Sequence, residues 1–554
     1  MAEISRAIGF ANLILHCGRR AMLVVCLLAL FPLAETETSA QQLDQFSLDR
    51  WKLLRETERY QLQIAEKIFA EKNYKVALAE YEKYLSLYEA SEAAPFAQLK
   101  WSLCQLKLRK SNTAIKEGFQ SVIDYWPDSP EAIAAAYYIG STYQSMGRQK
   151  QAKQVFRKLI ADHPAHLAGI YAANGLAAIA ATENDEKALL EIRRHLTFGV
   201  KRTRYSNDVC VAASQQLATQ CFFSAAFDEA VKSLATTYAA GEPLADHVIH
   251  FLRTPLRQLC ADNNTADQGE ALAQNAVSYF RGQMPSANDD SSKNLARKYW
   301  YHIAEVHALA GHDRQVPETY DQIIKAFGAE DATLGRLAQW YKSKDRYDDA
   351  RRTYQRYNDK IEGLNQVAYS HRQQSKPDLA VAVYNQTLGL DPENSIRWKT
   401  EIAATHRHFQ QFEKAIAVYE ELLAEDSEHE QDWRWQIATA YQEWGKYAEA
   451  IAQYRLCTNF PSNYRNMAWC NRKLKKYKEA IILYNQVLTH EPSAPWALLQ
   501  IGYTHEAAGN KEQAIKSFQI VCKKFPRDAH ASQAHAHLQN AYKISVTLGG
   551  AKDD

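Results

Sequence analysis

Hydrophobic positions recur at the spacing of amphipathic helices in the stretch YYIGSTYQSMGRQKQAKQVFRKLIADHP, which turns polar around Gly147. Small residues at Gly140 and Ala152 would let two helix backbones approach closely. The ring of Phe156 falls where a gap between stacked helix pairs must be filled, and Pro164 ends the second helix. The stretch therefore predicts an antiparallel helix pair that stacks on further pairs.

The small residue of the second helix returns along much of the chain, usually followed four residues later by an aromatic ring. It recurs between residues 361 and 526 as Ala380, Ala415, Ala450, Ala480 and Ala514, and more loosely upstream as Ala77, Ala114, Ala188 and Ala350. In the window 297–323 the position is taken by Val316. One such motif arises by chance in any helical protein, but five near-regular copies indicate a repeat of about 34 residues.

These residues and spacings resemble the tetratricopeptide repeat family over roughly 58–210 and 297–543. The resemblance implies an all-α fold, in which helix-turn-helix repeats stack into an α-solenoid with a right-handed superhelical winding. It allows one continuous array or two arrays joined by a divergent helical segment.

The pattern divides the chain into seven parts. They are a signal peptide at 1–40, a polar lead-in at 41–57 that enters its first helix near Leu48, an N-terminal array at 58–200, a divergent helical segment at 201–296, a C-terminal array at 297–527, a capping helix at 528–544 and a disordered tail at 545–554. The polar stretch 281–294, RGQMPSANDDSSKN, is rich in helix breakers and predicts a linker.

The N-terminus has the order of a secretory signal peptide. Two arginines precede an apolar run over 21–33, and small residues lead up to a cleavage site after Ala40. The run is too short to span a bilayer permanently, so no stable membrane span is expected after cleavage. The alternative is a short anchor that is kept, and a translation start at Met22 also stays open. We expect export to the periplasm or cell envelope, or secretion.

The N-terminal repeats carry a second resemblance. The turn YWPDSPEA between two of them is similar to the turns of bacterial cell-envelope repeat proteins, namely the coordinator of the Tol–Pal system and a lipoprotein of the outer-membrane assembly machinery. The likeness covers about two repeats, and the lipid-bearing cysteine of the lipoprotein family is absent from this sequence. It supports a location rather than a particular activity.

Composition argues against several classes of function. Lys and Arg number 66 against 64 Asp and Glu, without a basic block, so a nucleic-acid partner is not expected. The sequence contains no phosphate-binding glycine loop, nucleophile elbow or metalloprotease motif, so we expect no enzyme activity and no cofactor. His530, His535 and His537 form the densest histidine group, but His535 would lie off the shared helix face, so no metal site is predicted.

Seven cysteines follow the predicted cleavage site, and an odd number at wide spacing does not form a disulfide framework. We expect them to be small buried residues at helix contacts. A disulfide between Cys210 and Cys221 remains an alternative if two consecutive helices bring them together.

In the family that the chain resembles, the first helix of each repeat lines the concave surface with its positions 2, 5, 9, 12 and 13. Repeats that begin at Ile361, Ile396, Gln431, Pro461 and Pro495 then place ten residues in the groove. These are Tyr369, Arg372, Arg397, Arg407, Trp435, Arg465, Trp469, Arg472, Trp496 and Tyr503. Arginine and aromatic residues dominate binding energy at interfaces, and guanidinium groups favour acidic or C-terminal peptides. The alternative is that the tryptophans pack between repeats. The lysine and asparagine clamp of chaperone-binding repeats is absent at the corresponding positions.

The leading hypothesis is a non-enzymatic scaffold of the bacterial cell envelope that binds partner proteins or peptides in the groove of the solenoid. A structural component of a secretion or polysaccharide-export assembly is the second. An enzyme with a site in 201–296, where the repeat signature fades, is the third. The sequence leaves open the partner, the pathway and the oligomeric state.

Overall fold

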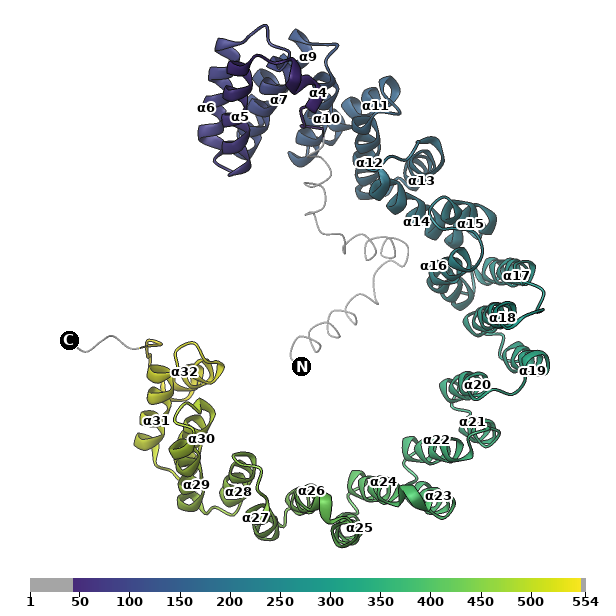
Figure 1. Cartoon of the computed structure of the whole chain (residues 1–554), viewed down its shortest axis with the longest axis vertical. Helices are drawn as coiled ribbons and strands as arrows, with labels where there is room; N and C mark the ends of the chain where they lie inside the picture. Colours follow the sequence, from purple (N-terminus) through teal and green to yellow (C-terminus); the bar gives the residue numbers. More distant parts are fainter. Residues whose placement is uncertain (1–42, 550–554) are drawn as a thin grey trace. The chain divides into compact units, whose positions relative to one another are not determined.

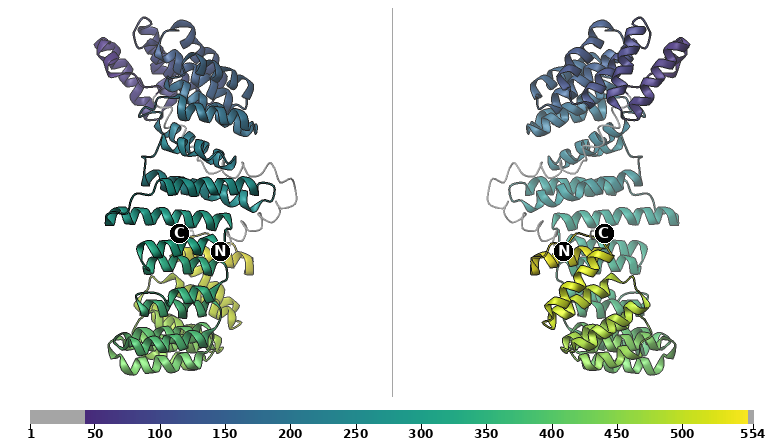
Figure 2. Two further views of the ribbon diagram at one scale, coloured as in Figure 1. Left: turned by 90° about the vertical axis from the view of Figure 1, so that its right-hand side faces the viewer. Right: turned by 90° about the vertical axis from the view of Figure 1, so that its left-hand side faces the viewer.

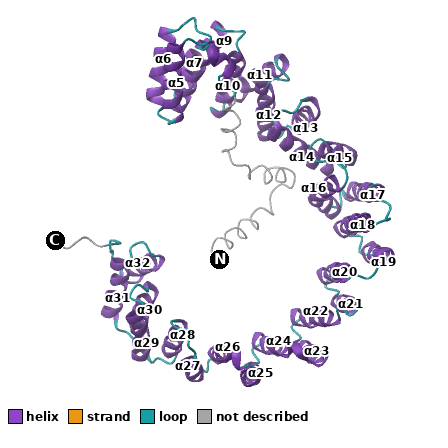
Figure 3. Ribbon diagram, viewed as in Figure 1, coloured by secondary structure: helices purple, strands orange, loops and turns teal. Residues whose placement is uncertain are grey.

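The structure is a computed structural model that describes residues 43–549, and every regular element in that range is a helix (Figures 1 and 3). Most helices pack mainly against the helix before and the helix after, and α16 (Glu242–Ala261) also packs closely against α14 (Asn207–Phe223) and α18 (Asp290–Ala310). The all-α fold of stacked helix pairs predicted from the sequence is thereby confirmed. The chain forms two compact units, which divide between Thr319 and Tyr320.

The first unit is a series of helix pairs. Its first half contains α4 (Leu48–Leu53), α5 (Glu56–Ala70), α6 (Tyr74–Leu87), α7 (Ala94–Lys107), α8 (Ser111–Thr113), η1 (Ala114–Phe119), α9 (Gln120–Tyr125), α10 (Pro130–Ser145) and α11 (Gln149–Asp162). Its second half contains α12 (Leu167–Thr182), α13 (Glu186–Arg194), η2 (His195–Gly199), α14 (Asn207–Phe223), α15 (Phe227–Ala235), α16 (Glu242–Ala261), α17 (Ala266–Gly282) and α18 (Asp290–Ala310). Helix α19 (Gln315–Phe327) spans the division between the units.

The second unit repeats one arrangement more regularly. It contains α20 (Asp331–Ser343), α21 (Tyr347–Tyr354), α22 (Lys360–Gln373), α23 (Pro377–Leu390), η3 (Pro392–Asn394), α24 (Ser395–His408), α25 (Phe412–Glu425), η4 (Ser427–His429), α26 (Glu430–Trp444), α27 (Tyr447–Leu456), α28 (Ser462–Lys473), α29 (Tyr477–His490), α30 (Pro495–Ala507), α31 (Lys511–Lys524) and α32 (Ala529–Tyr542). Within this unit the even-numbered helices α22 to α28 lie on the inner side of its curve, and the odd-numbered helices lie on the outer side (Figure 1).

The repeat residues do in the structure what their size predicts. The alanines at 380, 415, 450, 480 and 514 are completely buried where the second helix of a pair meets the first. A Cβ atom on Gly140 would lie 2.5 Å from the ring of Phe156, and one on Gly175 of the next repeat would lie 2.6 Å from it. Phe156 therefore fills the space between two repeats that only glycine leaves open. Ala188 is the exception, since it is only half-buried.

The divergent segment continues the helix pairs with longer helices. Helices α16, α17 and α18 share one large hydrophobic core, and they are among the long teal helices seen from the side in Figure 2. Helix α17 extends to Gly282 and α18 begins at Asp290, so the predicted linker shrinks to 283–289 and the predicted boundary at 296 lies inside α18. The polar run NDDSSKN was predicted to be linker, but Asp289 and Ser292 form a capping box that starts a helix.

The seven cysteines within 43–549 are free thiols, and all but the half-buried Cys260 are buried. The possible disulfide between Cys210 and Cys221 is wrong, because both lie on the single helix α14. Eleven residues of helix separate them by about 16 Å along the axis, far beyond the reach of a disulfide.

The predicted signal peptide at 1–40 and the last five residues of the predicted tail lie outside the described residues. Within 43–549, the helices are too short or too polar to cross a membrane.

Candidate functional site

Three arginines on the inner side of the second unit join successive repeats. Arg372 of α22 donates to Glu401 at 2.9 Å, Arg407 of α24 to Gln436 at 2.5 Å, and Arg472 of α28 to Gln500 at 2.8 Å. Each bond runs from one even-numbered helix to the next even-numbered helix. We call Arg372, Arg407 and Arg472 the arginine ladder. All three were predicted as groove residues, and the structure places them in one equivalent position.

A buried tyrosine lies behind each member of the arginine ladder. Tyr384, Tyr419 and Tyr484 are almost completely buried, and burial raises the pKa of each phenol, whereas the neighbouring guanidinium opposes that rise. Because each guanidinium group lies near a buried phenol and also donates to the next repeat, it is positioned by the fold rather than free in solvent.

An open groove of about 620 Å³ lies between the first two members of the arginine ladder. It is lined by Arg372, Ala404, Arg407, His408, Gln410, Phe412 and Glu443. The side chains of Arg372 and Arg407 are 22% and 29% exposed, and each already has a carboxylate partner, Glu401 at 2.9 Å and Glu443 at 3.4 Å. An acidic ligand would therefore have to displace these surface carboxylates from the two arginines, because neither arginine is unpaired.

The three predicted tryptophans lie on the same inner helices but are half-buried. Trp435 packs edge-on against Tyr454 at 4.9 Å, Trp469 against Tyr447 at 5.6 Å, and Trp496 against Tyr484 at 6.2 Å. These contacts support the interpretation that the tryptophans pack between helices, although each keeps part of its surface exposed.

The other four predicted residues are distributed along α22, α24, α28 and α30. Tyr369 is 47% exposed, with Lys342 Nζ 5.4 Å from its ring. Arg397 stacks over the buried Trp398 at 4.3 Å, and Arg465 lies over the Trp496 ring at 5.7 Å. Tyr503 packs against Phe518 and His537, with ring centroids 5.1 and 5.0 Å away. Of the ten predicted residues, Arg372 and Arg407 line the groove.

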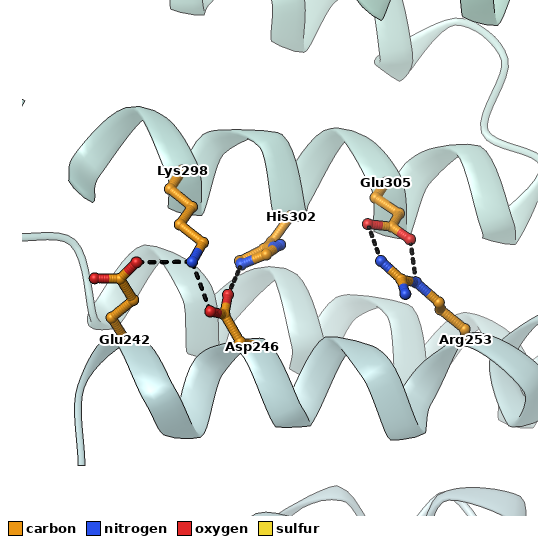
Figure 4. Close-up of polar contacts among 6 residues, drawn as sticks. All are labelled: Glu242, Asp246, Arg253, Lys298, His302 and Glu305. Atoms are coloured by element: carbon orange, nitrogen blue, oxygen red, sulfur yellow. Dashed lines mark hydrogen bonds and ion pairs between the residues drawn. The ribbon is translucent and has the colours of Figure 1, made fainter. Parts of the chain in front are cut away.

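A polar cluster that the sequence analysis missed joins α16 to α18 in the first unit (Figure 4). Lys298 Nζ donates to Glu242 at 2.7 Å and to Asp246 at 2.6 Å, and His302 Nε2 lies 3.1 Å from the other oxygen of Asp246. Burial lowers the pKa of His302, and Asp246 opposes that change. A histidine beside a carboxylate is also the arrangement of a general base, but Lys298 already shares this carboxylate.

About two helical turns beyond Asp246 on α16 and one turn beyond His302 on α18, Arg253 forms a two-bond ion pair with Glu305, at 2.5 and 3.2 Å (Figure 4). Opposite charges therefore alternate across the line where α16 meets α18, and the cluster holds the two helices in register. The signal in the sequence is the four-residue spacing of Glu242 and Asp246 and of Lys298 and His302, which places each pair on one helix face.

Two histidines of the group at the end of the second unit contact carboxylates of the same unit. His537 Nε2 lies 3.0 Å from both oxygens of Glu506, and His530 contacts the capping Asp528. Across residues 43–549, no set of three or more His, Cys, Asp or Glu side chains is arranged to hold a metal ion.

Sequence models of the tetratricopeptide repeat match four windows of the chain, at 134–166, 434–464, 464–494 and 496–528. Each window coincides with a helix pair described above, so the tetratricopeptide repeats predicted there are confirmed. Repeats of this kind bind protein partners. No curated protein shows significant similarity to the sequence.

Solved structures of repeat proteins resemble the chain only distantly. Yeast Tom70 shares 14% identity over 88% of this chain and 96% of its own, with a TM-score of 0.27. The MamA protein shares 17% identity over 34% of this chain and 97% of its own, with a TM-score of 0.25. A tetratricopeptide repeat protein from Parabacteroides merdae shares 16% identity over 38% and 86%, with a TM-score of 0.27. Scores this low carry no argument about arrangement or partners.

Proposed function

We propose that this chain, which carries tetratricopeptide repeats at 134–166 and 434–528, is a non-enzymatic scaffold that holds protein partners on the inner side of its second unit. The arginine ladder supports this proposal most directly. It presents positioned, partly exposed guanidinium groups beside half-buried aromatic rings, which is the composition of surfaces that bind proteins tightly.

The ligand that this surface favours is an extended segment with acidic side chains or a free C-terminal carboxylate. Arg372 and Arg407 lie on either side of the groove, and their present partners Glu401 and Glu443 are 40% and 44% exposed. Exposed ion pairs contribute little to stability, so the protein loses little free energy when an incoming carboxylate displaces Glu401 or Glu443. A guanidinium group can then bind the new carboxylate through two parallel hydrogen bonds.

Replacing Arg372 and Arg407 together by alanine should weaken binding of an acidic peptide at least about tenfold while the helical melting curve stays nearly unchanged. The probes are pools of labelled acidic peptides, with free and with amidated C-termini, titrated into the full chain. The loss should be largest at low salt, where charge attraction is least screened. Amidation separates recognition of the terminus from recognition of acidic side chains.

Arg455→Ala is the matched control, because Arg455 is exposed on the outer helix α27. It should bind the same peptides as the parent chain. Equal affinity in the double variant and the parent would place partner binding elsewhere.

We also propose that the scaffold acts after export, in the periplasm or cell envelope. The support is the order of charged, apolar and small residues before Gln41 in the sequence. N-terminal sequencing of the protein isolated from a producing bacterium should therefore begin at Gln41. A mature cytoplasmic form that starts at Met1 would contradict the location and leave the binding proposal untouched.

A further inference from the structure

The first described residues, 43–46, lie against the helices of the first unit. Leu43 packs against two neighbouring hydrophobic cores, one built largely on α7 and α10 and the other on α11 and α12. Phe46 is buried, with its ring centroid 5.1 Å from that of Phe96 on α7. No helix forms between Leu43 and Phe46. A short non-helical segment is thus held by apolar side chains at both ends.

Between these apolar anchors, Asp44 is buried beside Lys100 of α7. Their charged atoms are 3.5 Å apart, and the side chains are only 9% and 6% exposed. Lys100 is also 3.3 Å from Glu66 of α5. Both distances exceed the roughly 2.7–2.9 Å of a good charge-assisted hydrogen bond. One oxygen of Asp44 has no hydrogen-bond partner among the described residues, and burial raises the pKa of this carboxyl.

The lead-in makes one further polar contact with the same surface. Arg50 of α4 donates to the buried Glu131 of α10 at 2.6 Å. Its guanidinium group also lies 4.4 Å from the ring centroid of Phe46, so α4 and the segment before it are held together. The covered surface therefore involves α5, α7 and α10, which are the first helices of three successive pairs. In the second unit, the open groove described above includes residues of the first helices α22, α24 and α26.

The segment 43–46 is connected to α5 through the six-residue helix α4 and a short link. Such a tether holds a ligand at an effective concentration on the order of millimolar, so weak contacts suffice to keep it in place. A buried carboxylate with one unpaired oxygen and a long ion pair is a weak contact of this kind.

We propose that residues 43–46 are an intramolecular ligand that covers a segment-binding groove on α5, α7 and α10. A partner segment with an acidic side chain between two apolar side chains displaces them. Lys100 receives the acidic group, and the hydrophobic surfaces now covered by Leu43 and Phe46 receive the apolar ones. This groove belongs to the first unit and does not depend on the arginine ladder.

The test uses the full chain and a labelled synthetic peptide, LDQFSLDRWKLL, which copies residues 43–54. The parent chain should bind this peptide weakly, because its own segment competes. The double variant Leu43→Ala, Phe46→Ala should bind it at least about tenfold more tightly. Adding Lys100→Met to the double variant should remove most of that gain. A peptide with Asn in place of its first aspartate, the copy of Asp44, should bind the double variant more weakly.

Leu48→Ala, Leu53→Ala is the matched control, since these two leucines of α4 are 79% and 71% exposed. It should bind the peptide as weakly as the parent chain does. The arginine-ladder variant Arg372→Ala, Arg407→Ala should also leave this binding unchanged, so failure of one proposal is distinguishable from failure of the other.

Hydrogen exchange provides a second readout that does not depend on the variants. Excess peptide should speed exchange of the amides at 43–47 in the parent chain and slow exchange in α7. The proposal is overturned if the double variant keeps its helical signal yet binds no more tightly than the parent. It is overturned equally if the double variant loses the fold of the first unit and excess peptide leaves exchange at 43–47 in the parent unchanged, because the segment is then a fixed part of the core.

Discussion

Replacing Ala450 by tryptophan should lower the free energy of unfolding by at least ~1–3 kcal/mol, among the largest losses from a single change in this chain. Ala450 is completely buried in the hydrophobic core that it shares with Ala438 and Tyr454. The indole ring has no space there, so α26 and α27 must move apart. Urea denaturation followed by circular dichroism measures the effect.

The same helix provides the control for this substitution. Ala452 is exposed on α27, so Ala452→Trp adds the same side chain without forcing two helices apart. It should unfold at nearly the parent urea concentration. If Ala450→Trp and Ala452→Trp unfold alike, the assignment of the repeat positions in this region is wrong.

Replacing Trp398 by alanine should cost ~3–5 kcal/mol of unfolding free energy, because the substitution removes a completely buried ring. Trp398 lies in the core formed with Ala368 and Tyr384, and its indole nitrogen donates to Asp391 at 2.9 Å. Alanine leaves a cavity there and removes one hydrogen bond to Asp391, which keeps the bonds from Asn394. Thermal and urea denaturation measure the loss.

Trp435→Ala is the informative comparison, because Trp435 is half-buried on the groove side. If Trp435 is mainly a packing residue, its removal should lower the melting temperature, and acidic-peptide affinity should fall only as the protein unfolds. If Trp435 anchors a ligand, affinity should fall by ~2 kcal/mol while the melting curve barely moves. If both stability and affinity stay unchanged, Trp435 contributes neither to packing nor to ligand binding.

The repeat residues were predictable from the sequence because their constraints are local. A small residue at Ala450 or Gly140 is required by the neighbouring helix of the same pair, and that helix is always the next one along the chain. The repeat starts assigned at Ile361, Ile396, Gln431, Pro461 and Pro495 each lie within one residue of the first residue of α22, α24, α26, α28 or α30. This includes the repeat around Pro461, which has fewer residues than the others. Helix α28 begins at Ser462, one residue after that proline.

Sequence reasoning placed the arginine ladder but not its partners. The repeat phase identifies Arg372, Arg407 and Arg472 as equivalent positions, whereas their partners depend on how one repeat is rotated against the next. Helix periodicity carries no information about that rotation. The burial of the tryptophans also depends on this rotation, so helix periodicity could not predict it.

The contacts of residues 43–46 were not predictable because no repeat pattern includes them. In the sequence, these residues belong to a polar lead-in. Only the folded chain shows that Leu43, Asp44 and Phe46 pack against helices of the first unit. The repeat signature fades over 201–296 because of helix length. Helices α16 and α18 are longer than the repeat allows, so the period is lost although the packing of pairs continues.

The packing of most helices against their near neighbours in the chain bears on how the protein is made. Contacts between segments close in sequence form quickly, since little chain entropy is lost in bringing them together. The first helix pairs can therefore fold while later pairs are still being synthesised. An interruption of synthesis would leave a shorter folded stack with one uncovered apolar end, which is a surface that chaperones and proteases recognise.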